Sequence, residues 1–196
     1  MRAHSENAAV QQQGCVALWL LAIYKAENQV TIAKVGGIGA VLEGMKVHKD
    51  SAGVQEKACR ALRSLASNAD NKLTIAAAGG IGLVLQALKA HKDSADVQDQ
   101  ACRALGMLAR SNDDNAVTIA GAGGIEAIAA ATTAHKGSAA VQAAACSALD
   151  TLAGYPGLRG RIKAAGGVEL AKRAVSASDA SERTKKWGEA LLKKLA

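Results

Sequence analysis

The sequence predicts an all-α protein, a solenoid in which short helical units stack along one axis. The first observation is a period, since several features recur every 43 or 44 residues along the 196-residue chain. The second is composition: Phe is absent and Trp and Tyr number two each, so the core must be built from small aliphatic side chains, which suit helix-on-helix packing. The third is that no unit of this length can bury its apolar faces alone, so neighbouring units must share a core.

The period is carried by glycine pairs, Val-Gln pairs, single cysteines and single histidines. The glycine pairs begin at Gly36, Gly79, Gly123 and Gly166, and the Val-Gln pairs at Val10, Val54, Val97 and Val141. The cysteines are Cys15, Cys59, Cys102 and Cys146, and the histidines are His4, His48, His91 and His135. Every Cys and His of the chain therefore lies on the repeat.

Three helices can be justified in order within one unit. NKLTIAAAGG at 71–80 predicts a short helix with Asn71 as N-cap and the glycine pair as its end. GIGLVLQALKAHK at 80–92 predicts a second helix, and DSADVQDQACRALGMLAR at 93–110 predicts a longer third helix. Their apolar stripes are Ile81, Val84, Leu85 and Leu88, and then Val97, Ala101, Ala104, Leu105 and Leu108.

This unit resembles the armadillo repeat. The period lies in the range shared by armadillo and HEAT arrays. The Ala-Gly corner in TIAAAGGIGLVLQAL and the third-helix pattern in VQEKACRALRSLA are similar to the armadillo pattern. The resemblance implies a right-handed α-solenoid of three-helix repeats, an N-terminal helix plus four full repeats, forming a single domain. The parts are a partial repeat at 1–27 and repeats at 28–70, 71–114, 115–157 and 158–196.

The connection His-Lys-Asp-Ser occurs at 48–51 and again at 91–94, and it contains the residue types of a catalytic triad. A triad holds its base between nucleophile and acid in space, usually from separated segments, whereas these residues share one interhelix connection. His and Lys favour the negative end of the preceding helix, and Asp or Ser can cap the next one. We therefore predict helix-end residues and no enzyme.

The cysteines and histidines predict neither a metal site nor a disulfide. Stacked helices lie ~8–10 Å apart, whereas a disulfide needs Cα atoms within ~7 Å and a metal needs ligands ~2 Å from one ion. The thiols are predicted to be buried structural groups in a reducing compartment. The glycine pairs lack the preceding strand of a phosphate loop, so we predict no cofactor.

In armadillo arrays the third helices line the concave face, so the resemblance places partner contacts there. A column is the set of equivalent positions in successive repeats. The two columns that hold Trp and Asn in importin-α-like repeats hold other residues here, so a nuclear-import adaptor is not implied. The predicted partner-binding residues are Lys57, Arg60, Arg63, Ser64, Arg103, Met107, Ser147 and Thr151. Arginine suits a protein or peptide with carboxylates or phosphates. Alternatively, the pairs Glu56–Arg60 and Asp99–Arg103 only solvate this face.

The N-terminal helix, in CVALWLLAIYKA at 15–26, is apolar nearly all round. A helix of this kind is normally buried, so we expect it to contact another copy of the chain or a larger assembly. The predicted interface consists of Val16, Trp19 and Leu20. Alternatively, the helix is an N-terminal cap that packs Leu18 and Leu21 against the following unit, or the chain is part of a longer array whose preceding unit covers it.

The net charge of +7 is concentrated in residues 157–196, which hold ten Lys and Arg against four Asp and Glu. Asp179 with Glu182 resembles a capping box that opens a soluble final helix. Nucleic acid or another acidic surface is a lower-ranked partner for this end, because one Trp without interleaved aromatics is a weak signal.

The sequence thus predicts a non-catalytic scaffold that binds a protein partner on its third-helix face. The alternative is a structural subunit held in a stable assembly, or a homo-oligomer, through the N-terminal helix. Neither a leader peptide nor an apolar run of ~18 residues is apparent, so we expect no membrane span. A cytoplasmic location is expected, with the nucleus left open.

Overall fold

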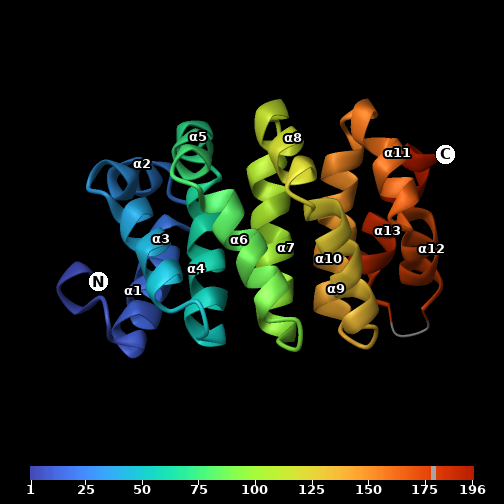
Figure 1. The fold of residues 1–196 in the computed structure, drawn as a ribbon. Helices are drawn as coiled ribbons and strands as arrows, with labels where there is room; N and C mark the ends of the chain where they lie inside the picture. The colour runs from blue at the N-terminus through green and yellow to red at the C-terminus, as the bar shows by residue number, and fades with distance from the viewer. Residues whose placement is uncertain (178–179) are drawn as a thin grey trace.

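The computed structural model describes residues 1–177 and 180–196. Within those residues the chain forms 13 α-helices and one short 3-10 helix, with no strand, so the all-α prediction is confirmed (Figure 1). The helices are η1 (Arg2–His4), α1 (Ala8–Ala22), α2 (Ala26–Lys34), α3 (Gly37–Val47), α4 (Ala52–Leu65), α5 (Ala69–Ala77), α6 (Gly80–Ala90), α7 (Ala95–Ala109), α8 (Asp113–Gly121), α9 (Gly124–Ala134), α10 (Ala139–Ala153), α11 (Pro156–Ala164), α12 (Gly167–Ser176) and α13 (Glu182–Leu195).

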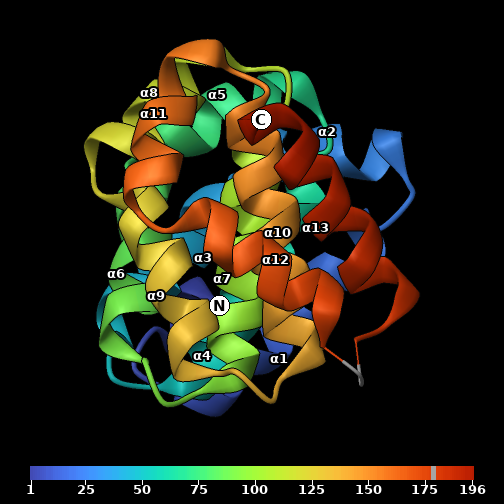
Figure 2. The same ribbon diagram turned by 90° about the vertical axis from the view of Figure 1, so that its right-hand side faces the viewer.

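After α1, the helices stack as four units of three, from α2–α4 to α11–α13. The third helices α4, α7, α10 and α13 continue a row that begins with α1, and each packs against the one before it (Figure 1). The second helices α3, α6, α9 and α12 pack against this row as another layer (Figure 2). The first helices cross the top of both layers in Figure 1, and the chain ends lie at opposite ends of the stack. The solenoid prediction is confirmed.

The predicted apolar stripes form the core of the central unit. Buried on α6 are Ile81, Val84, Leu85 and Leu88, and buried on α7 are Val97, Ala101, Ala104, Leu105 and Leu108. All four cysteines are free and buried. Burial raises the pKa of Cys15, Cys59 and Cys146 to about 12, and it raises the pKa of Cys102 as well. These thiols are structural, as predicted.

The predicted start of the first helix is wrong by three residues. Asn68, not Asn71, is the N-cap of α5, because its side chain accepts a hydrogen bond from the Asn71 backbone N–H. The Asn71 side chain is buried and donates to the carbonyls of Leu65 and Gln29, at 3.1 and 3.0 Å. Asn71 therefore supplies a hydrogen bond to a carbonyl at the end of the preceding third helix and joins two units.

Each glycine of the pair meets a different requirement at the corner between the first and second helices. Gly79 has φ +78°, a left-handed conformation that side chains disfavour. Gly80 has ordinary dihedrals, but a Cβ there would lie 2.5 Å from Cγ2 and 2.8 Å from the carbonyl oxygen of Ile75. Both positions therefore need glycine, as the corner prediction required.

The His-Lys-Asp-Ser connection joins helices, as predicted, and also joins units. Ser94 caps α7 by accepting a hydrogen bond from the Val97 N–H, and His91 is the C-cap of α6. In addition, the Nε2–H group of His91 donates to the Lys49 carbonyl of the preceding unit at 2.8 Å. His48 and His135 repeat this bond, to Ser5 and Lys92. Sequence reasoning missed this ladder between units.

The glutamine of each Val-Gln pair closes the second helix. The side chain of Gln98 donates to the carbonyls of Leu88 and His91, at 2.8 and 3.0 Å. Gln11 donates in the same way to the carbonyls of Met1 and His4. The segment before α1 thus occupies the place that a second helix and its connection occupy in the later units.

The last helix, α13, begins at Glu182. Its N-cap is Ser181, whose side chain accepts a hydrogen bond from the Thr184 N–H at 3.1 Å. The capping role expected for Asp179 falls on a residue outside the described ones. Since α13 packs against α10 and α12 as earlier third helices do, it is the third helix of the fourth unit.

Candidate functional site

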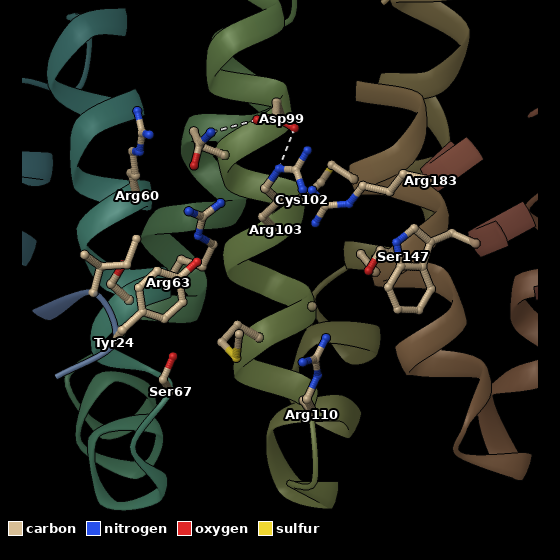
Figure 3. Close-up of a pocket in the computed structure, with 18 residues that line it drawn as sticks. Tyr24, Arg60, Arg63, Ser67, Asp99, Cys102, Arg103, Arg110, Ser147 and Arg183 are labelled. Atoms are coloured by element: carbon tan, nitrogen blue, oxygen red, sulfur yellow. Dashed lines mark hydrogen bonds and ion pairs between the residues drawn. The ribbon is translucent and has the colours of Figure 1, made fainter. Parts of the chain in front are cut away.

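A groove of about 600 Å³ runs along the third-helix face (Figure 3). Residues of α4, α7, α10 and α13 line it, and Tyr24 lies at its N-terminal end. Its charged lining consists of five arginines and one aspartate: Arg60, Arg63, Arg103, Arg110, Arg183 and Asp99. The groove therefore carries a strong positive charge, although the first three-quarters of the chain are nearly neutral.

The arginines of the groove lie close enough to repel one another. Burial lowers the pKa of Arg63, and the charges of Arg103 and Arg60 lower it further. The single acid, Asp99, is largely committed: Arg103 Nε donates to it at 2.7 Å, and Gln100 Nε2 donates to its other oxygen at 2.7 Å. Burial raises the pKa of Asp99, and Arg103 opposes that change. Most of the positive charge thus remains available to an anionic ligand.

Six of the eight residues predicted for partner binding line this one groove. They are Arg60, Arg63, Ser64, Arg103, Met107 and Ser147. Lys57 lies outside it, paired with Glu56 at 2.8 Å. Thr151 lines an adjoining hollow with Asp150, and its hydroxyl donates to the Ser147 carbonyl at 2.9 Å.

The alternative that ion pairs neutralise this face holds for one unit only. Asp99 and Arg103 form the expected pair. Glu56 instead pairs with Lys57, so the expected Glu56–Arg60 pair is absent. Arg60 lies over the Trp19 ring, with its Cζ 3.4 Å from the ring centroid, a cation–π contact that leaves the positive charge in place.

The predicted N-terminal interface is only partly open. Val16 is half-buried and Trp19 is half-buried beneath Arg60, so neither is a free apolar group. Leu20 is 56% exposed. In the alternative that the helix is a cap, Leu18 is half-buried as expected, but Leu21 is 54% exposed.

The groove residues that escaped sequence reasoning include two aromatic side chains and two arginines: Tyr24, Trp187, Arg110 and Arg183. Arg183 and Trp187 lie in the final helix, which was expected only to be a soluble end of the stack. The 43-residue register was the available signal, since it aligns Trp187 with Ala144 and so places α13 in the row of third helices. Nothing in the sequence indicated that Tyr24 would have a φ of 59°.

No group of three or more His, Cys, Asp or Glu side chains in residues 1–177 and 180–196 could hold a metal ion. Over the same residues, no single helix is long and apolar enough to cross a membrane, although the bent pairs α5–α6 and α8–α9 reach that length and composition together.

A stack of three-helix units with glycine corners and a third-helix groove defines an α-solenoid of the armadillo class, a class of protein-binding scaffolds. The chain belongs to the LRRK2 ARM repeat family, which matches residues 1–123. The armadillo resemblance is therefore confirmed.

Individual relatives agree with this assignment. Protein aardvark of Dictyostelium discoideum is 40% identical over 76 residues, which cover 35% of this chain and 10% of that protein. The chain thus spans about a tenth of the length of this relative. A solved engineered protein of the Northeast Structural Genomics Consortium is 25% identical, with a TM-score of 0.87 over 96% of this chain and 76% of that one. A designed armadillo repeat protein in complex with the peptide (KR)4 has a TM-score of 0.82 at 19% identity, over 94% and 75% of the two chains.

Proposed function

We propose that the protein is a non-catalytic scaffold that binds an acidic segment of a partner protein in its third-helix groove. The observation that carries the proposal is the charge of the groove, where five arginines face one aspartate. A planar guanidinium grips a carboxylate at two points, so a row of arginines suits an extended chain that carries several acidic side chains.

The arrangement of the arginines supports an extended ligand. Arg60 and Arg63 come from α4, Arg103 from α7, and Arg183 from α13, so the positive groups span several units (Figure 3). Burial is the largest cause of the lowered pKa of Arg63, and the charges of Arg103 and Arg60 lower it further. An anion that enters the groove relieves this repulsion. Tyr24 and Trp187 place aromatic groups in the same groove. No step of catalysis is proposed, because the His-Lys-Asp-Ser residues serve as helix ends.

The four free, buried thiols are consistent with a reducing compartment, so a cytoplasmic location is part of the proposal. Microscopy of the tagged protein in intact cells would test it. Enrichment in a secreted or vesicular fraction would contradict this location without bearing on the groove.

Binding can be tested with fluorescent peptides of defined charge. The probes are an octamer of glutamate, the opposite-charge peptide (Lys-Arg)4 and a single-stranded RNA of eight uridines, titrated by anisotropy at two salt concentrations. The test variant is Arg63→Glu with Arg183→Glu. Its matched control is Lys34→Glu with Lys163→Glu, which makes the same change of charge at exposed positions outside the groove.

We expect the glutamate peptide to bind and (Lys-Arg)4 not to bind. The groove variant should weaken binding at least about tenfold, by loss of roughly 1.4 kcal/mol or more, while the control changes it little. Equal loss in both variants would mean that only net charge matters, which contradicts a specific groove. Tighter binding of RNA than of the peptide would favour the nucleic-acid alternative.

A further inference from the structure

The outer face of α1 carries the residues with which every later third helix packs against its predecessor. One column of this face is leucine in each unit: Leu21, Leu65, Leu108 and Leu152. The last three have 0, 0 and 1% of their surface exposed, whereas Leu21 is 54% exposed. The same side chain that is core in three helices is therefore surface in α1.

A column of small residues repeats the contrast. Ala61, Ala104 and Ala148 are 0, 0 and 1% exposed, and the equivalent Ala17 is exposed. Small residues in this column allow neighbouring helices to approach closely, since a Cβ on Gly106 of α7 would lie 3.2 Å from Cα of Ala148 on α10. The face of α1 is thus shaped to receive a helix at close range.

Tyr155 shows how a later unit holds the end of the third helix before it. The Tyr155 hydroxyl donates to the Ala109 carbonyl at the end of α7, and it accepts a hydrogen bond from the Asn112 N–H at 3.0 Å. It therefore clasps the end of the preceding third helix. Tyr24 has the same register, but its φ is 59° whereas that of Tyr155 is −95°, and Tyr24 lines the groove, so it does not repeat this contact.

The lower end of the face carries a histidine in the register of the histidines that join the later units. The histidines of the later units donate from Nε2 to a backbone carbonyl of the preceding unit, as His48 does to Ser5 at 2.6 Å. His4 occupies the same register and is exposed. Leu21, Ala17 and His4 together form the α1 docking face, which repeats the interface by which units stack.

We propose that the α1 docking face binds the open third-helix end of an armadillo-type array on another protein, so that two arrays join end to end. The partner offers an apolar helix face to Leu21 and Ala17, and a free backbone carbonyl to His4. The argument is continuity with the stacking interface within this chain, and it does not depend on what binds in the groove.

A second copy of this chain is a poor occupant, because its own last helix has a charged outer face. Glu189 takes the register of Cys102 and Cys146, which are fully buried, and Glu189 is exposed. Lys193 takes the register of Gly106, the residue that approaches Ala148. Docking this end on α1 would bury Glu189 and Lys193 against Leu21 without partners, at a large desolvation cost.

The charged residues on the outer face of α13 allow a direct test. Glu189→Ala with Lys193→Ala restores small uncharged residues to the outer face of α13 and makes the full-length protein its own probe. We expect the wild type to remain monomeric in light scattering after size exclusion, and this double variant to form head-to-tail chains at about 10–100 µM.

Blocking α1 should disperse those chains. Leu21→Glu in the double variant should raise the concentration needed for assembly at least roughly tenfold, and His4→Ala should raise it by a smaller factor. The control is Leu73→Glu, which alters a leucine of equal 54% exposure on α5 and should leave assembly unchanged. Circular dichroism would verify that each variant keeps its helices.

Three results would overturn the proposal. The first is a double variant that stays monomeric while folded. The second is assembly that Leu21→Glu does not affect, because the chains would then use another surface. The third is a wild-type oligomer dispersed by Leu21→Glu, which would make a second copy the occupant of the α1 docking face.

Discussion

The glycine pair at the corner of each unit can be separated into two physical requirements by substitution at Gly79 and Gly80. At Gly79 nothing lies within 4 Å of an added Cβ, so Gly79→Ala is opposed only by the left-handed φ of +78°. That conformation costs a non-glycine residue about 1–2 kcal/mol, and the stiffer unfolded chain recovers part of it. We expect a loss of about 1 kcal/mol, and a smaller loss for Gly79→Asn, because Asn tolerates this region.

At Gly80 the obstacle is steric. The added Cβ would lie 2.5 Å from Ile75 Cγ2, 2.8 Å from the Ile75 carbonyl oxygen and 3.2 Å from Leu42 Cδ2. Ile75 is fully buried and its carbonyl is backbone, so neither can move aside cheaply. Overpacking of this kind costs about 1–3 kcal/mol, and we expect Gly80→Ala to fall at the upper end.

Urea unfolding followed by circular dichroism would measure both losses in the full-length protein. The two glycines are adjacent in a central unit, so any departure from two-state unfolding affects both variants alike. The reasoning fails if Gly80→Ala is no more destabilising than Gly79→Ala, or if Gly79→Asn is worse than Gly79→Ala.

Three further outcomes follow from the packing. Leu65→Ala should lower the free energy of unfolding by about 2–4 kcal/mol and Leu21→Ala by under about 1 kcal/mol, because only Leu65 is buried; equal losses in urea would contradict the repeat register. All four thiols should resist a thiol reagent at pH 8 in the native protein and react after unfolding. The reason is that burial raises the pKa of three of them to about 12 and also raises the pKa of the fourth, Cys102. Labelling of the native protein should become faster as the pH rises, because the reactive thiolate forms only as the pH approaches the raised pKa. Rapid labelling at pH 8 would contradict the burial of the thiols. His135→Ala should cost about 1 kcal/mol by removing the 2.6 Å bond to Lys92, and no change in the urea midpoint would show that the bond contributes nothing.

The period, together with the glycine corner and the apolar spacing within each unit, was enough to predict the fold. The corner at Gly79 and Gly80 and the leucine columns follow from residue type and spacing, because each unit must solve the same packing problem. The role of Asn71 did not follow, since an asparagine near a helix start is equally compatible with capping its own helix and with bonding the previous one. Contacts between units escape a reading that treats one unit at a time.

The candidate site was predictable only where a third helix was recognised. Arg63 and Arg103 were placed on the groove because their helices match the repeat pattern. Arg183 and Trp187 were missed because α13 departs from that pattern, although it keeps the register. The stacking of Arg60 on Trp19 was also missed, since i,i+4 spacing favoured a pair with Glu56 and gave no information about the neighbouring helix.

Some columns hold the units together and others face the groove, and this difference explains why the groove is hard to predict and where binding specificity arises. Columns that hold the stack repeat one residue type, as the leucines, cysteines, glutamines and histidines do, because every junction between units has the same geometry. The column of Ile23, Ser67, Arg110 and Gly154 changes at every unit, and its first three members line the groove. Its side chains are therefore not fixed by stacking, and they help to set the shape and charge that a partner meets along the third-helix face. Because Ser67 and Arg110 are both exposed, an exchange of these two residues should leave the stack intact while moving one positive charge by one unit along the groove.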